Sequence, residues 1–269
     1  MPNKYLQIDG VATYVHHTGP TTLPEAPPVV EHGEAVVCLH GAGGNGNLFA
    51  ELLGGLEQEH TLIAFDQPGH GRSGELDSLG EIGRMAAFTG RVLDALGLGP
   101  VVLIGHDMGA AVALRCALDR PEGVRALVVC SAGDRFELPD DVVEQMRRVR
   151  DGKERRPFDK GAFSSKAAPE IMKRAFMEGM KTDPRATFGD LVACREWSDA
   201  ERLGSVAVPT LVVHGEDDRE AVKTSAAALA ERVPGARLET ISGAGHSLLI
   251  EAPGPLAERV RDFLAGLPS

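Results

Sequence analysis

The stretch that most constrains the fold of this chain is VVLIGHDMGAAVAL, residues 101–114. Four apolar residues lead into GHDMG, and an alanine-rich run follows, which predicts a buried strand, a sharp turn and a helix. Gly105 and Gly109 permit a strained turn and a close approach of the helix to the strand. Asp107, at the apex, is expected to point out of the sheet at a helix N-terminus, although a simple N-cap aspartate gives the same local pattern.

Short apolar runs recur along the chain, and helical patterns lie between them. Continuous runs of this kind are typical of strands covered on both faces. We therefore predict an α/β fold with a mainly parallel central sheet flanked by helices, whose ligands bind outside the carboxyl ends of the strands. Residues 17–28 are expected to form a loop in an early hairpin. The predicted strands are residues 35–40, 61–66, 101–105, 126–132, 209–215 and 237–242.

Residues 134–205 interrupt this alternation because they are rich in charged residues and contain no strand-like run. Within them, residues 167–181 carry apolar side chains at helical spacing, which predicts an amphipathic helix. We expect a helical lid (cap) insertion at 134–205 and a core formed by residues 1–133 and 206–269. An ordinary run of surface helices is the alternative.

Composition and charge argue against several classes of function. The formal net charge is −11, which gives no counterion release on a phosphate backbone, so no nucleic acid partner is expected. The chain has no run of about eighteen apolar residues and no signal-like start, so we expect no membrane partner and a cytoplasmic location. The four cysteines lie far apart and are expected to be reduced core residues. Apart from the acidic pair in HGEDD, no cluster of His, Cys or carboxylate residues that could bind a metal stands out. We therefore expect no metal and no organic cofactor.

Two further segments could supply partners for a nucleophile at Asp107. The segment VVHGEDDRE (212–220) ends a strand-like run with acidic residues, and His246 lies in a glycine-rich loop after the last run. Nucleophile, acid and histidine in this order form a known hydrolytic triad. The segment CLHGAGGNGNLF (38–49) has glycines after a strand, which leaves backbone N–H groups open to hold an oxyanion. A phosphate loop is excluded because no Lys-Ser/Thr pair follows at the required spacing.

Across nearly its whole length the chain resembles the α/β-hydrolase fold superfamily. The motifs that carry the resemblance are HGAGG (40–44), DQPGHGRSG (66–74), GHDMG (105–109), HGEDD (214–218) and GAGHS with IEAP (243–253). Asp218 is preferred over Asp217 because it fits the G-x-x-D spacing of the family. The resemblance implies these site residues: Asp107 as nucleophile, Asp218 as orienting acid, His246 as base, and oxyanion donors from Met108 and from Ala42 or its neighbour Gly41.

An aspartate at the apex changes the chemistry expected of the site. Free aspartate has a pKa of about 3.9, so its carboxylate is ionised near neutral pH and needs no base to activate it. It can attack an sp³ carbon, displace halide or an epoxide oxygen, and form an alkyl-enzyme ester. His246, oriented by Asp218, would then activate the water that hydrolyses this ester. In this respect the chain resembles epoxide hydrolases and haloalkane or haloacid dehalogenases.

Other features resemble a different branch of the superfamily. Epoxide hydrolases usually carry tyrosines in the lid, whereas the two tyrosines here, Tyr5 and Tyr14, are N-terminal. Dehalogenases usually have tryptophan where this chain has Met108, and HGAGG lacks the proline of their HGxP loop. The rest of the chain resembles serine esterases, enol-lactonases and carbon–carbon bond hydrolases. An esterase or lactonase scaffold whose nucleophilic serine is replaced by Asp107, naturally or by engineering, is therefore the alternative.

A third hypothesis is a non-catalytic ligand-binding protein that keeps the same pocket. Under all three, the ligand is expected to be a small, largely apolar molecule between the sheet edge and the lid. Candidate contacts are Phe136, Phe176 and Trp197, which could equally belong to the interior of the lid. We expect a monomer or a homodimer with no partner other than a small-molecule substrate.

Overall fold

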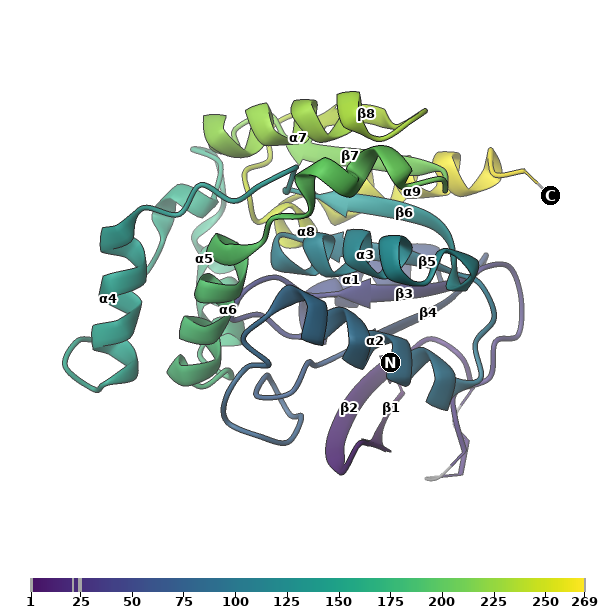
Figure 1. The fold of residues 1–269 in the computed structure, drawn as a ribbon, viewed down its shortest axis with the longest axis horizontal. Coiled ribbons are helices and arrows are strands. Elements are labelled where there is room, and N and C mark those ends of the chain that lie inside the picture. Colours follow the sequence, from purple (N-terminus) through teal and green to yellow (C-terminus); the bar gives the residue numbers. More distant parts are fainter. Residues whose placement is uncertain (1, 21, 24–25, 269) are drawn as a thin grey trace.

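The computed structural model describes residues 2–20, 22–23 and 26–268. Its centre is one eight-stranded sheet with the order β1-β2-β4-β3-β5-β6-β7-β8 (Figure 1). β1 and β2 pair antiparallel, as do β2 and β4, and all remaining neighbours are parallel, which confirms the predicted architecture. The strands are β1 (Asn3–Ile8), β2 (Val11–His17), β3 (Ala35–Leu39), β4 (Thr61–Phe65), β5 (Val101–His106), β6 (Val124–Cys130), β7 (Thr210–Gly215) and β8 (Arg237–Ile241).

The early hairpin exists, but the expected position of its loop is wrong. β1 and β2 are joined at Asp9 and Gly10, whose φ angles of 51° and 82° suit a tight turn. The chain between His17 and Ala35 instead leads from β2 to β3. The Gly- and Pro-rich composition of that stretch indicates a loop without locating it.

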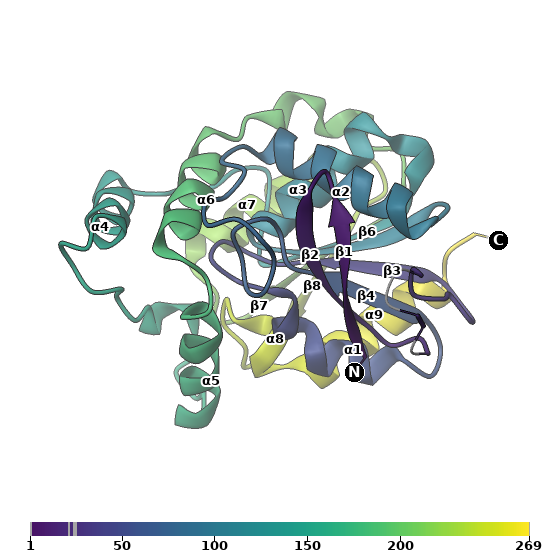
Figure 2. The same ribbon diagram turned by 90° about the horizontal axis from the view of Figure 1, so that it is seen from below.

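Helices cover both faces of the sheet (Figures 1 and 2). Alternate side chains of a central strand enter the two cores: Leu39 of β3 belongs to one, and Cys38 to the other. Double coverage explains why the strands read as continuous apolar runs. No described helix is long and apolar enough to cross a membrane. One core contains α2 (Ile82–Leu96), α3 (Met108–Asp119) and α7 (Glu220–Arg232), and the other contains α1 (Ala50–Leu56), α8 (Leu248–Glu251) and α9 (Pro253–Ala265).

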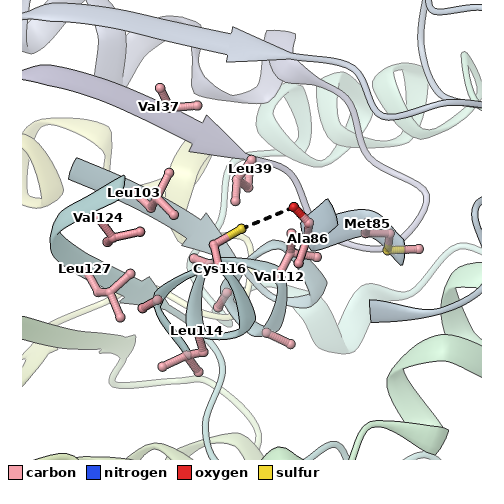
Figure 3. Close-up of a cluster of buried hydrophobic side chains, with 14 of the residues drawn as sticks. Val37, Leu39, Met85, Ala86, Leu103, Val112, Leu114, Cys116, Val124 and Leu127 are labelled. Atoms are coloured by element: carbon pink, nitrogen blue, oxygen red, sulfur yellow. Dashed lines mark hydrogen bonds between the residues drawn. The ribbon is translucent and has the colours of Figure 1, made fainter. Parts of the chain in front are cut away.

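α3 is held firmly behind the turn that carries Asp107. Its residues Val112 and Cys116 lie in a buried cluster with Leu39 of β3 and Met85 of α2 (Figure 3). The Cys116 thiol donates a 3.6 Å hydrogen bond to the carbonyl oxygen of Ala86 in α2. All four cysteines of the chain are free and buried, as expected of reduced core residues.

Between β6 and β7 the chain forms α4 (Asp140–Arg150), α5 (Pro169–Gly179) and α6 (Pro184–Glu196), which lie at one end of the sheet (Figure 1). α5 falls inside the helix predicted for residues 167–181. Both α5 and α6 begin with proline, which is favoured in the first turn because its missing N–H has no helical acceptor there. We call residues 134–205 the lid below; the exact division between core and lid stays a prediction.

The turn at Asp107 requires glycine on both sides. A Cβ atom at Gly105 would overlap the carbonyl oxygen of Gly109, and one at Gly109 would overlap that of Leu39. Between them Asp107 has φ 51° and ψ −122°, a conformation that L-residues rarely adopt. Such a residue costs on the order of 1–3 kcal/mol, which the surrounding packing must offset.

Replacing Gly109 by alanine is expected to lower the free energy of unfolding by about 1–3 kcal/mol, because the new methyl group must displace the Leu39 backbone. Gly54 is the matched control: it lies exposed in α1, and a Cβ atom there meets nothing within 4 Å. Gly54→Ala should raise the free energy of unfolding by about 0.5–1 kcal/mol. Urea unfolding of both variants measures the difference, and equal effects would contradict the packing described.

Candidate active site

The strained turn places Asp107 between the end of β5 and the start of α3. Its backbone N–H donates a 3.0 Å hydrogen bond to the carbonyl oxygen of Cys130 on β6, and its own carbonyl accepts from Ala110 at 2.9 Å. The side chain is 20% exposed, at the carboxyl end of the parallel strands. The Asp107 side chain is therefore fixed in direction while remaining partly exposed.

The two oxygens of the Asp107 carboxylate have different environments. Oδ2 accepts a 2.9 Å hydrogen bond from the backbone N–H of Ala42. Oδ1 lies 3.8 Å from Nε2 of His246. Gly41 makes the first contact possible, because a Cβ atom there would lie 2.9 Å from Oδ2. One oxygen is thus held by the loop after β3, and the other faces the histidine.

Asp218 and His246 are in direct contact, as the resemblance implies. Nδ1 of His246 lies 3.2 Å from Oδ1 of Asp218, whose side chain is fully buried. The same oxygen accepts from the backbone N–H of Arg219 at 2.8 Å. Its neighbour Asp217 is exposed. The contact with Asp218 orients the imidazole so that Nε2 points at Asp107.

These contacts shift two pKa values. Burial lowers the pKa of His246, but the hydrogen bond to Asp218 and the charge of Asp107 raise it more, so the net change is upward from 6.5. Burial raises the pKa of Asp218, but the hydrogen bond and charge of His246, together with the hydrogen bond from the Arg219 N–H, lower it more, so the net change is downward. His246 is a base only when neutral, so any step in which it removes a proton needs a pH above its raised pKa.

Two further residues, for which the sequence predicted no role, form hydrogen bonds to the loop that holds His246. Glu251 accepts 2.9 Å hydrogen bonds from the backbone N–H groups of Gly245 and of Ser164 in the lid. Nε2 of His106 lies 2.9 Å from the carbonyl oxygen of His246, to which it donates. Both lie inside quoted motifs, IEAP and GHDMG, so the motifs contained the signal. Their partners are 140 residues away for His106 and 87 for Glu251 with Ser164, distances that a motif does not reveal.

Residues 41–44, which we call the oxyanion loop, follow β3. Ala42 provides the N–H group that contacts Asp107. Met108, the other expected donor, begins α3 with its backbone N–H at the helix start and its side chain buried in the core. The role of Met108 as a donor stays a prediction, as does that of Gly41.

The three lid residues proposed to contact a substrate pack against their neighbours. Phe176 is 37% exposed and meets Phe158 edge to face at 5.9 Å. The rings of Phe136 and Trp197 lie 5.6 Å apart, and the Trp197 indole donates to Asp199 at 2.9 Å. Trp197 also lines a cavity of about 120 Å³ whose lining residues include none of the triad candidates. Contact of these three with a substrate stays a prediction.

The pKa of His246, followed by NMR, should lie above 6.5 in the unmodified protein. Asp107→Asn should lower it, because the substitution removes a negative charge but keeps an oxygen that can accept from Ala42. His40 is an internal control, since burial and the neighbouring His70 lower its pKa to about 3 and keep it neutral in both proteins. The same midpoint for His246 in both would contradict the contact with Asp107.

Comparisons with known proteins identify the family of this chain. A family described as "alpha/beta hydrolase fold" matches residues 34–253. The pimeloyl-[acyl-carrier protein] methyl ester esterase of Xanthomonas campestris is 29% identical over 89% of this chain and 98% of its own length. Polyketide synthase ThaQ of Burkholderia thailandensis is 31% identical over 81% of this chain, which spans only 11% of that protein.

Among solved structures, the enol-lactonase of Burkholderia xenovorans aligns with a TM-score of 0.86 over 98% of this chain and 100% of its own. At 18% identity this likeness shows the fold alone. The family match covers most of the chain, from before β3 to the start of α9. This chain is therefore a member of the α/β-hydrolase fold family, and an enzyme of its hydrolase class.

Proposed function

We propose that the protein hydrolyses small, largely apolar alkyl halides or epoxides, with Asp107 as the nucleophile. The observation that supports this most directly is that the two oxygens of the Asp107 carboxylate have different partners. Oδ2 is held by the Ala42 N–H group at 2.9 Å, and Oδ1 is left facing His246 across 3.8 Å. A carboxylate nucleophile needs one oxygen fixed and the other free to attack.

In the first step an electron pair of Oδ1 forms a bond to the substrate carbon, and the carbon–halogen bond breaks to release halide. The product is an ester whose carbonyl oxygen is Oδ2. Halide leaves without a proton. An epoxide oxygen needs one, and both tyrosines of the chain lie in β1 and β2, outside the lid. Alkyl halides therefore fit the proposal better than epoxides.

In the second step Nε2 of His246 takes a proton from water, and the hydroxide adds to Cγ of Asp107. Negative charge develops on Oδ2, where the Ala42 N–H group already points. The bond between Cγ and Oδ1 then breaks, and the alcohol leaves with the proton from His246. The regenerated carboxyl group releases its own proton, so substrate and water give alcohol, halide and a proton.

A second candidate function is hydrolysis of carboxylic esters or lactones by a scaffold whose serine is replaced by Asp107. The relatives favour it, since an esterase and an enol-lactonase are among the similar proteins. Attack of Asp107 on an ester would give a mixed anhydride, which is a poor intermediate. A purely ligand-binding protein is disfavoured by the direct contact of Asp218 with His246.

Replacing His246 by alanine should trap the alkyl-enzyme ester, because attack by Asp107 remains possible while its hydrolysis loses the base. We expect intact-protein mass spectrometry after treatment with alkyl halides and epoxides to show one added alkyl group, located on the peptide containing Asp107. The double variant Asp107→Asn/His246→Ala is the control and should gain no mass. Equal alkylation of the double variant would rule out Asp107 as the nucleophile.

Restoring serine separates the second candidate from the first. If the scaffold is an esterase, Asp107→Ser should hydrolyse aryl esters at least about 100-fold faster than the unmodified protein, because proton transfer by a positioned side chain such as His246 typically contributes about 10²–10⁴-fold. Asp107→Ala serves as the control for unspecific hydrolysis. Equal, low esterase activity in all three proteins would reject the ester-hydrolase candidate.

A further inference from the structure

Asp190 is a buried carboxylate that the mechanism above does not use. It lies on α6, and its Oδ2 accepts a 2.8 Å hydrogen bond from the backbone N–H of Gly43 in the oxyanion loop. The same oxygen lies 2.7 Å from Nε2 of His70, in the loop after β4. Neither side chain is exposed to solvent. One carboxylate of the lid therefore joins two loops of the core.

The surroundings of His70 indicate that this pair is ionic. Its Nδ1 lies 3.0 Å from the carbonyl oxygen of Pro68, and its Nε2 lies next to Asp190, so both ring nitrogens meet acceptors. An imidazole satisfies two acceptors only when both nitrogens carry hydrogen. Burial lowers the pKa of His70, but Asp190 raises it more. Burial raises the pKa of Asp190, and His70 more than reverses that shift.

The lid meets the oxyanion loop at two consecutive glycines. Gly43 has φ 65°, and a Cβ atom there would lie 2.8 Å from Oγ1 of Thr187 on α6. The carbonyl oxygen of Gly44 accepts a 3.0 Å hydrogen bond from Oγ1 of Thr182. These contacts begin one residue after Ala42, whose N–H group holds Asp107.

We propose that Asp190 is a positioning residue that aligns the Ala42 N–H group with Asp107. The N–H of Gly43 belongs to the peptide plane that joins it to Ala42, so fixing its direction restricts the backbone at Ala42. Without the Asp190 carboxylate as acceptor, the N–H group of Gly43 would turn away. The N–H group of Ala42 would then no longer point at Oδ2 of Asp107. A misplacement of about 1 Å can cost about 100-fold in rate.

This inference rests on the proposed function of the Ala42 N–H group, and it adds a condition to that function. The acceptor for Gly43 comes from the lid, 147 residues along the chain. A displacement of α6 would move Asp190 away, so Gly43 would lose its acceptor and His70 would lose its counterion. The oxyanion loop then has its full set of hydrogen bonds only while the lid is in place.

The test is backbone NMR of Ala42 and Gly43 in the unmodified protein, Asp190→Ala and Asp190→Asn. Asp190→Ala should shift both amide signals and speed hydrogen exchange at Gly43 by at least about tenfold. Asp190→Asn keeps an oxygen acceptor for Gly43, so its amide signals should return toward those of the unmodified protein. Asp183→Ala is the matched control, because Asp183 caps the same helix and its side chain accepts hydrogen bonds from Arg185.

Unchanged Ala42 and Gly43 signals in Asp190→Ala, or shifts equal to those in Asp183→Ala, would overturn the proposal. If Asp190→Ala does not fold, a measurement on the unmodified protein still tests the proposal. A scalar coupling across the hydrogen bond from the Gly43 nitrogen to the Asp190 carboxyl carbon is expected, and its absence overturns the proposal. None of these measurements uses a substrate, so failure of the alkyl-ester test leaves their outcome standing.

A rate measurement adds a readout that loss of stability alone would not give. In the His246→Ala background, Asp190→Ala should lower the limiting rate of ester formation by about 10- to 100-fold with little change in the half-saturating substrate concentration. Asp183→Ala, which weakens the lid at its cap, should leave that rate unchanged. A fall of the same size in both variants would count against a positioning role.

Discussion

The site depends on the close contact of α3 with the ends of β3 and β5. Glycine at 105 and 109 lets the backbones touch, and this contact drives Asp107 into a conformation that L-residues rarely adopt. The same approach brings the oxyanion loop next to the carboxylate, so that Ala42 donates to it. The strain at one residue and the hydrogen bond that it makes possible are therefore two consequences of one packing constraint.

Two carboxylates, buried Asp190 and half-buried Glu251, connect the lid to the oxyanion loop and to the loop that holds His246. Glu251 joins Gly245, next to His246, to Ser164 of the lid. Asp190 joins the oxyanion loop to α6 and is balanced by His70. Both carboxylates accept hydrogen bonds from backbone N–H groups, and at Asp190 this offsets part of the cost of burying the charge. The lid is thus hydrogen-bonded to the oxyanion loop and, through Glu251, linked to the loop that holds His246. It contributes to the geometry of both loops.

Much of the fold was predictable because its signals are local. Strands covered on both faces read as apolar runs, and the sharp turn reads as GHDMG. The meeting of Asp107, Asp218 and His246 followed from the resemblance, whereas spacing alone left Asp217 open. Asp190 and His70 could not be foreseen, because their contact joins residues 120 positions apart and neither stands in a pattern that names a partner. The bond from the Trp197 indole N–H to Asp199 could not be read from the sequence either, and the contact of Trp197 with a ligand stays a prediction.

Attack of Asp107 on the substrate carbon can be followed through the fate of the oxygen atom of water. With enzyme in excess over an alkyl halide that it turns over, one turnover in heavy-oxygen water separates the two routes. Attack by Asp107 predicts that the heavy oxygen appears in the Asp107 carboxylate, while the first alcohol released carries an oxygen of ordinary mass. Heavy oxygen in the first alcohol, with an unlabelled Asp107 peptide, would mean that water attacks the substrate directly and would rule out Asp107 as the nucleophile.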